Sequence, residues 1–194
     1  FFLHSNPFID IFVDFISNFI ADHQDQPFFV YYPMALVHCP FCPTPKSSDW
    51  NPASRGSKSY KGDPKHFADM VNYADHAVGR ILDCLKENHL DEDTLVIFIG
   101  DNGTDTPIVT STVYGEVTGA KGQTTDGGNH VPCIMRWPNG IAAPGEICQD
   151  IIDFSDFLPT LCQLAQAGPP TQTDGRSFLP QLMGQPSQPR ECIY

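Results

Sequence analysis

The segment from Thr94 to Gly103 constrains the fold of this chain more than any other feature. It consists of Thr-Leu-Val-Ile-Phe-Ile-Gly-Asp-Asn-Gly, so an apolar run ends at a carboxylate, an amide and a glycine. The run is too short for an ordinary helix and predicts a strand buried on both faces, as in a parallel sheet. Ligands of open α/β sheets bind beyond the carboxyl ends of the strands, so Asp101 and Asn102 are expected at a functional edge.

The chemistry of Asp101 and Asn102 suits a hard cation. Together they offer a carboxylate and an amide oxygen, and oxygen donors of this kind are preferred by Ca²⁺ and Mg²⁺. The sequence Asp-Asn-Gly also forms ordinary turns at strand ends. Taken alone, the segment therefore leaves open both a cation site and a simple turn.

Helical and strand patterns alternate along the rest of the chain. Apolar residues at three- and four-residue spacing predict helices over residues 7–21, 63–88 and 155–167. Short apolar runs predict strands over residues 28–32, 94–100 and 131–137. Such alternation is typical of a layered α/β fold. The connection over residues 104–129 is unusually long for a compact domain, which points to a functional loop.

Composition narrows the class of protein. Of the 194 residues, 41% are hydrophobic and 18% are charged, which is typical of a folded globular chain. The net charge of −12 argues against non-specific nucleic-acid binding and against docking on anionic membranes. No apolar run approaches the roughly 20 residues of a membrane span. The apolar start has no basic region, so no signal peptide is expected, and both ends are interpreted as cuts from a longer protein.

The seven cysteines give no clear metal or redox motif. Cys39 and Cys42 have the spacing of such a pair, but no second pair accompanies them. The segment over residues 39–62 is rich in Pro, Ser and Lys and is predicted to be a long surface loop. Cys84, Cys133 and Cys162 lie in predicted helices or a predicted strand and are expected to be buried free thiols.

Two further polar residues stand where a ligand could bind. His38 lies just beyond the predicted strand over residues 28–32, and Lys121 lies in a glycine-rich segment over residues 119–128. Glycine lets the backbone approach a ligand closely, and a lone lysine offers a compact positive charge for an anion. One oxygen-ligated cation, one lysine and one histidine together suit a tetrahedral oxyanion such as sulfate or phosphate.

The order and the amino-acid sequences of five segments resemble those of the sulfatase family, within the alkaline-phosphatase superfamily. These segments are Pro27–Tyr32 leading to His38, Tyr73–Leu82, Thr94–Gly103, Lys121-Gly122 with Asp126–Pro132, and Asp156–Leu161 with Asp174–Pro180. The third is similar to the family pattern Leu-Val-Ile-Phe-x-x-Asp-Asn-Gly. In the fourth, Asp126 stands where the family usually has Glu, and His130 stands where it usually has Arg.

The resemblance implies a role for each polar position. Asp101 and Asn102 would be ligands of a divalent cation, usually Ca²⁺ in this family. Lys121 and His38 would be catalytic and substrate-binding residues that contact the oxygens of the sulfate ester. The family nucleophile is a formylglycine made from a Cys/Ser-x-Pro-x-Arg motif, which lies nearer the N-terminus in the family and does not occur in these residues.

The resemblance also implies a fold and a function. We expect an alkaline-phosphatase-like α/β fold, with a mixed, mainly parallel sheet sandwiched by helices and incomplete at both ends. Residues 1–194 would form one partial catalytic domain that lacks the part bearing the nucleophile. The expected reaction is hydrolysis of a small-molecule or carbohydrate sulfate ester, by a protein that is secreted, periplasmic or lysosomal. The isolated chain is expected to be inactive.

Two alternatives stay open at this point. The first is a phosphoester or phosphonate hydrolase of the same superfamily, which the missing nucleophile would distinguish. The second is a non-catalytic fragment that keeps an oxyanion-binding site.

Overall fold

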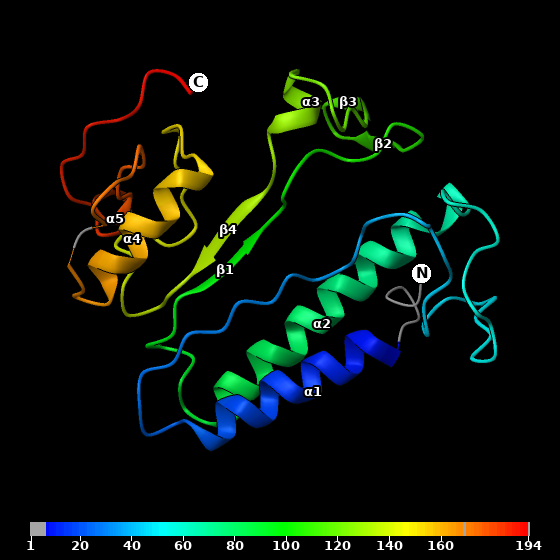
Figure 1. Ribbon diagram of the computed structural model, residues 1–194, viewed down its shortest axis with the longest axis horizontal. Helices are drawn as coiled ribbons and strands as arrows, with labels where there is room; N and C mark the ends of the chain where they lie inside the picture. Colours follow the sequence, from blue (N-terminus) through cyan, green and yellow to red (C-terminus); the bar gives the residue numbers. More distant parts are fainter. Residues whose placement is uncertain (1–6, 169, 194) are drawn as a thin grey trace. The chain divides into compact units, whose positions relative to one another are not determined.

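The computed structural model describes residues 7–168 and 170–193. The chain divides into two compact units, Phe1–Met135 and Arg136–Tyr194, and each is described by itself (Figure 1). Helices and strands both occur, in agreement with the predicted α/β class. None of the helices in the described ranges is long and apolar enough to cross a membrane.

Helices α1 and α2 lie side by side and run in the same direction in the first unit (Figure 1). Helix α1 spans Pro7–Asp22, and α2 spans Phe67–Glu87 after a single 3-10 turn, η1, at Pro64–His66. The Asp63 carboxylate accepts a hydrogen bond from the Lys65 N–H at 3.1 Å and so caps this start. Both helices therefore form where the apolar spacing predicted them.

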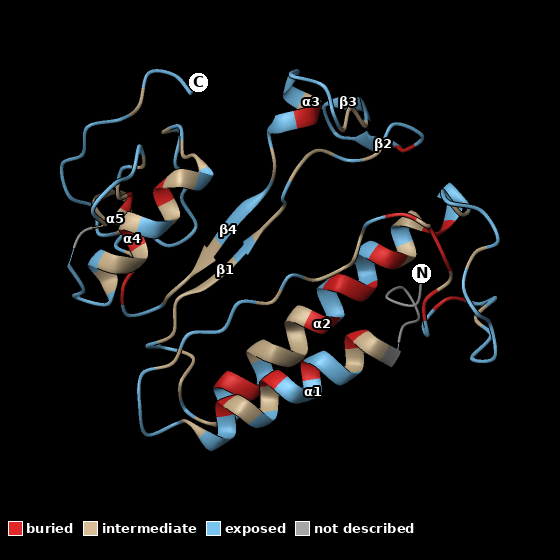
Figure 2. Cartoon of the chain, viewed as in Figure 1, coloured by how far each residue is buried: buried red, intermediate tan, exposed pale blue. Residues whose placement is uncertain are grey.

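The core between the two helices uses one stripe of α1. Its buried members are Ile9, Val13, Ile16 and Ile20, and they pack against Tyr73, Ala77, Cys84 and Leu85 of α2 (Figure 2). Burying each large aliphatic side chain contributes about 2 kcal/mol. Ile11, Phe12 and Phe15 are apolar residues of the predicted helix, yet they are exposed. The helix is apolar on more than one face, and only one face meets α2.

A cluster of polar side chains also links α1 to α2 through hydrogen bonds and ion pairs. The Asp10 carboxylate accepts hydrogen bonds from the Tyr73 hydroxyl at 2.7 Å and from Arg80 Nη1 at 2.8 Å. Arg80 also pairs with Asp14 through its other terminal nitrogen. Burial, together with the bond to Asp10, raises the pKa of Tyr73 well above its ordinary value, so its hydroxyl stays a donor.

The strands form two short ladders. Strand β1 (Val96–Ile99) pairs with β4 (Cys133–Arg136), and β2 (Val109–Thr112) pairs with β3 (Gly115–Thr118) as an antiparallel hairpin. The Gly100 N–H donates to the Pro132 carbonyl at 3.1 Å. This bond joins the end of β1 to the start of β4, so these strands also run in opposite directions. A four-residue helix, α3 (Asp126–Asn129), precedes β4.

Two local expectations differ from the structure. The predicted strand over residues 28–32 is extended but forms no ladder within the described ranges; Phe28 and Tyr32 pack on the α1–α2 core instead. Strand β1 is only partly buried, with Phe98 exposed.

The cysteine expectations are partly wrong. All seven thiols are free, and Cys84 is buried as expected, but Cys133 is exposed because its face of β4 is uncovered. The predicted surface loop over residues 39–62 begins with a buried turn. Cys39, Phe41, Cys42 and Thr44 are all buried there.

The second unit contains η2 (Phe154–Asp156), α4 (Phe157–Leu164) and the short α5 (Leu179–Leu182). Pro159 lies in the first turn of α4, where its missing N–H costs no helical hydrogen bond. Phe157 packs edge-on against Phe178, with ring centroids 5.2 Å apart. The predicted helix near Ser155 is therefore confirmed, although it ends at Leu164.

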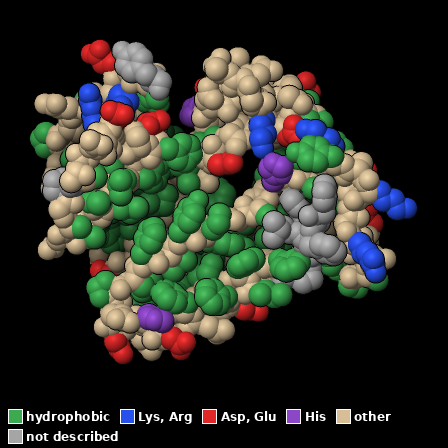
Figure 3. All heavy atoms as spheres, viewed as in Figure 1, with side chains coloured by type: hydrophobic (Ala, Val, Ile, Leu, Met, Phe, Trp, Pro, Cys, Tyr) green, Lys and Arg blue, Asp and Glu red, His purple; other side chains and the backbone are tan. Residues whose placement is uncertain are grey.

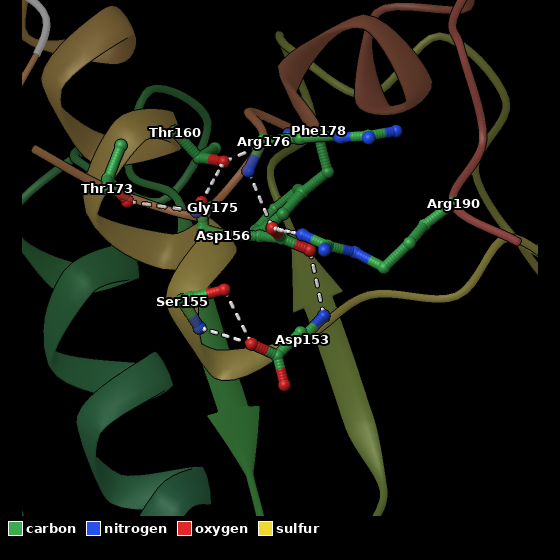
Figure 4. Close-up of polar contacts among 9 residues, drawn as sticks. All are labelled: Asp153, Ser155, Asp156, Thr160, Thr173, Gly175, Arg176, Phe178 and Arg190. Atoms are coloured by element: carbon green, nitrogen blue, oxygen red, sulfur yellow. Dashed lines mark hydrogen bonds and ion pairs between the residues drawn. The ribbon is translucent and has the colours of Figure 1, made fainter. Parts of the chain in front are cut away.

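One buried carboxylate, Asp156, organises this unit (Figure 4). One of its oxygens accepts from the Arg176 N–H at 2.6 Å and from the Arg190 guanidinium, and the other accepts from the Asp153 N–H at 2.8 Å. The Thr160 hydroxyl, one turn along α4, accepts from the Phe178 N–H at 3.0 Å. These bonds explain why the segments 156–161 and 174–180 occur together: the first binds the backbone of the second.

Candidate functional site

Asp101 and Asn102 follow β1 after Gly100, at the end of the strand where the sequence predicted them. The Gly100–Pro132 hydrogen bond holds the start of this turn against the segment that enters β4. Asp101 is exposed and Asn102 is half-buried. Their oxygens therefore lie at the surface of the first unit, on a turn whose backbone is fixed from one side.

Glycine contacts bring the glycine-rich loop against this turn. The Gly103 N–H donates to the Gly128 carbonyl at 2.8 Å. A Cβ atom at Gly103 would lie 2.0 Å from the Gly127 carbonyl oxygen, so no larger residue fits this approach. Glycine is therefore required in Asp-Asn-Gly because two backbone segments approach each other closely there.

Lys121 is tied to the same turn through its backbone. Its N–H donates to the Thr104 carbonyl at 3.0 Å, and the Gly119 N–H donates to the Ile108 carbonyl at 2.9 Å. The Lys121 residue is half-buried. The structure therefore brings together the two segments that carry Asp101, Asn102 and Lys121, although they are about twenty residues apart in sequence.

His38 lies on a turn that packs on the next part of the same connection. Its neighbours Val37 and Cys39 belong to a hydrophobic cluster with Ile108. His38 itself is exposed, and its Nδ1 lies 2.6 Å from the Cys39 carbonyl oxygen. A carbonyl can only accept, so this geometry assigns the proton to Nδ1. The ring is thereby oriented by its own backbone.

The donor set for a cation is chemically suitable but small. Asp101 and Asn102 contribute hard oxygens, whereas Ca²⁺ takes about six to eight oxygen ligands. Within residues 7–168 and 170–193, no group of three or more His, Cys, Asp or Glu side chains is placed to hold a metal ion. The residues present therefore fit as part of a calcium site, and the assignment of His38, Asp101, Asn102 and Lys121 to the site stays a prediction.

Sequence reasoning missed one residue that touches several of these segments, Asp105. Its carboxylate pairs with the Lys61 ammonium and accepts from the Thr106 N–H at 2.9 Å. Hydrogen bonding to Lys61 holds the pKa of Asp105 below its usual range, and the Cys39 thiol adds to this effect. No local pattern signals the contact, because Lys61 and Asp105 are 44 residues apart.

Two cavities lie away from these residues. One of about 410 Å³ lies in the first unit, under the segment that includes Trp50, Ser57 and His66. Another of about 510 Å³ lies in the second unit, where Arg176 and Arg190 line it with Asp156. Neither cavity includes a residue that the sequence assigned to the site.

Known proteins resemble this chain over most of its length. The sulfatase family model matches residues 4–167. Arylsulfatase A of Homo sapiens is 34% identical over 176 residues, which cover 90% of this chain and 32% of that protein. Steryl-sulfatase of Homo sapiens is 32% identical over 180 residues, which cover 87% of this chain and 28% of that protein.

Solved structures share the fold. A protein from a study of glycosaminoglycan metabolism by Bacteroides thetaiotaomicron superposes with a TM-score of 0.71 at 23% identity, over 96% of this chain and 38% of that one. The crystal structure of Ps i-CgsB superposes with a TM-score of 0.69 at 26% identity, over 91% of this chain and 38% of that one.

The chain belongs to the sulfatase family, and its fold is the alkaline-phosphatase-like α/β fold of these neighbours. The resemblance inferred from the five sequence segments is thereby confirmed. The chain spans about a third of the length of the first curated relatives it matches.

Proposed function

We propose that this chain is part of a longer enzyme that hydrolyses a sulfate monoester. Family membership supports this class of reaction. The observation that carries the proposal is the joining of the Asp101–Asn102 turn to the Lys121 loop, by the Gly103–Gly128 and Thr104–Lys121 backbone hydrogen bonds. One segment could supply cation-binding oxygens and the other a fixed positive charge, and the two segments thus meet beyond the carboxyl end of β1.

Each side chain has a proposed role. Asp101 and Asn102 would hold a divalent cation, with Ca²⁺ expected, and a bound cation would polarise the sulfate group. Lys121 would bind sulfate oxygens and stabilise the charge that develops on them. His38, whose Nδ1 faces the Cys39 carbonyl, would contact the ester oxygen and help the alcohol to leave.

The rest of the active site would come from the longer protein. We place residues 1–194 in one catalytic domain whose remaining part supplies the formylglycine nucleophile and further metal ligands. Matched relatives about three times as long leave room for such residues. The proposed location is secreted, periplasmic or lysosomal, as expected for the family.

The proposed substrate is a small-molecule or carbohydrate sulfate ester. The relatives include arylsulfatases, steryl-sulfatases and the N-acetylgalactosamine-6-sulfatase of Canis lupus familiaris. One neighbouring structure, Ps i-CgsB, is in complex with k-i-k-neocarrahexaose. The names of the relatives favour sulfate over the alternative phosphate or phosphonate ester.

The test compares two chromogenic esters on the full-length protein. We expect 4-nitrophenyl sulfate to be hydrolysed faster than 4-nitrophenyl phosphate. Lys121→Ala and Asp101→Ala should each lower kcat/KM for the sulfate about 100-fold or more, because each removes charge stabilisation at the reacting group. Faster turnover of the phosphate would contradict the proposal.

Matched control variants separate a role in the site from general damage. Lys86→Ala and Asp83→Ala change the same residue types at exposed positions of α2. Both controls should keep the kcat/KM of the unmodified protein. If Lys121→Ala behaves like Lys86→Ala, Lys121 does not contact the substrate and the proposed site is wrong.

A further inference from the structure

Asp105 lies at a junction of the three segments that carry the proposed site residues. Its carbonyl accepts from the Ile108 N–H at 3.1 Å. Gly119 packs so closely on this carbonyl that a Cβ atom there would lie 2.2 Å from its oxygen. The backbone of Asp105 therefore supports the loop that leads to Lys121, two residues after Gly119.

The side chain of Asp105 extends the junction to a third segment. The carboxylate is only 15% exposed and pairs with the Lys61 ammonium, which is 48% exposed. The thiol of Cys39, the residue after His38, helps to hold the pKa of this carboxylate below its usual range. The Asp105 carboxylate thus pairs with the segment of Lys61. The Asp105 backbone follows Asp101 and Asn102 and is hydrogen-bonded to Ile108, which packs with Cys39.

Lys61 is itself held in place by the buried turn after His38. The Phe41 N–H donates to the Lys61 carbonyl at 2.8 Å, and the Asp63 N–H donates to the Phe41 carbonyl at 3.0 Å. A Cβ atom on Gly62 would lie 2.2 Å from the Phe41 carbonyl oxygen, so the segments around Phe41 and Gly62 are in direct contact. Moving Lys61 would therefore require moving the turn that carries Cys39.

We propose that Lys61 and Asp105 form a positioning pair. The pair holds three segments in place relative to one another: the His38 turn, the Asp101–Asn102 turn and the Lys121 loop. The inference rests on the function proposed above, because it assigns the pair to that site. Neither residue touches the substrate. The pair acts through the backbone segments to which each partner is hydrogen-bonded.

Stability alone does not account for such a pair. Ion pairs with a partly exposed partner contribute little to the free energy of unfolding. Residues that orient the groups of an active site, by contrast, commonly change activity about 10- to 100-fold when they are replaced. Replacing Lys61 should therefore affect turnover far more than it affects the melting temperature.

The experiment uses the full-length protein with Lys61→Met, Asp105→Asn and the double variant. We expect each single variant to lower kcat/KM for 4-nitrophenyl sulfate about tenfold. The double variant should be no worse than either single one, since both changes remove the same interaction. Lys61→Arg should recover most of the activity because it keeps the charge.

The control is Lys65→Met. Lys65 is also an exposed lysine of this segment and pairs with Asp49 and Asp63, but it does not contact Asp105. Its kcat/KM should stay within about twofold of the unmodified protein, as expected for a surface ion pair. A tenfold loss in Lys65→Met, or an additive loss in the double variant, would overturn the positioning role.

A second readout does not depend on activity. The N–H groups of Lys121 and Gly119 are hydrogen-bonded to Thr104 and Ile108, so their hydrogen exchange reports the register of the loop. Exchange at both should quicken in Lys61→Met and Asp105→Asn but not in Lys65→Met. If the unmodified protein hydrolyses no sulfate ester, the proposed function is wrong, but the exchange measurement still tests the positioning role. If the variants change neither the exchange rates nor kcat/KM, the positioning role is wrong.

Discussion

Single buried polar residues decide how the loops of this chain are joined. Asp156 is 2% exposed, yet its carboxylate accepts from the Arg176 and Asp153 N–H groups and from the Arg190 guanidinium (Figure 4). A buried carboxylate is stable only when it is paired in this way. Asp105 acts similarly in the first unit, where its side chain pairs with Lys61.

Replacing the Asp156 charge should destabilise the second unit. Asp156→Asn is expected to lower the free energy of unfolding by about 3 kcal/mol, because the largely buried Arg190 guanidinium loses its counter-charge. Urea unfolding followed by circular dichroism measures the change. Asp174→Asn, at an exposed position of the same unit, should shift the free energy by less than about 0.5 kcal/mol. Equal effects of the two changes would show that the buried pair is not the cause.

At the scale of elements, one connection contains most of the proposed site. The segment between β1 and β4 holds the β2–β3 hairpin and the short helix α3 (Figure 1). Backbone hydrogen bonds from Gly103, Gly119 and Lys121 close its base. The tip of the hairpin, at Val113 and Tyr114, is almost fully exposed. The connection is therefore rigid at its base, where the site residues lie, and uncovered at its tip.

The faces of α1 give a paired test of which side chains form the core. Ile16 is 5% exposed and packs on α2, whereas Phe15, the preceding residue, is 67% exposed. Ile16→Ala should lower the free energy of unfolding by about 3 kcal/mol, since it removes buried methyl groups and leaves a cavity. Phe15→Ala should change it by less than about 0.5 kcal/mol. Urea denaturation of both variants measures the difference, and a large effect of Phe15→Ala would mean that this face is covered.

At the scale of the whole molecule, much apolar surface is uncovered. Phe29, Tyr31 and Ile134 of the first unit are among the exposed large hydrophobic residues. Figure 3 shows many exposed hydrophobic side chains on the face turned to the viewer. Exposed apolar surface of this kind is typical of regions that pack against further protein. This agrees with a chain that spans about a third of the length of its curated relatives.

The 194-residue chain by itself is expected to have no sulfatase activity. Asp101 and Asn102 supply only part of the roughly six to eight oxygens of a calcium site, and the nucleophile motif does not occur in the sequence. The measurement is hydrolysis of 4-nitrophenyl sulfate with Ca²⁺ added, with the full-length protein as the positive control. Turnover by the isolated chain that Lys121→Ala abolishes would contradict this expectation.

Features that depend on neighbouring residues could be predicted from the amino-acid sequence. The apolar spacing predicted α2, and the run before Asp101 predicted β1 with its two polar residues at the end. The amino-acid sequences of the five segments also indicated the family, which the match to the sulfatase family model confirmed. Helix periodicity, capping and the order of motifs are all properties of short stretches of chain, so they can be inferred without knowing what packs where.

Features that depend on distant residues became visible only in the folded chain. It selected the stripe of α1 that is buried, turned β4 back against β1, and buried Cys39 and Phe41 in what looked like a surface loop. It also paired Lys61 with Asp105 and joined the Asp101 turn to the Lys121 loop. Each of these contacts links residues far apart in sequence, and its free energy arises only when the intervening chain has folded to bring them together.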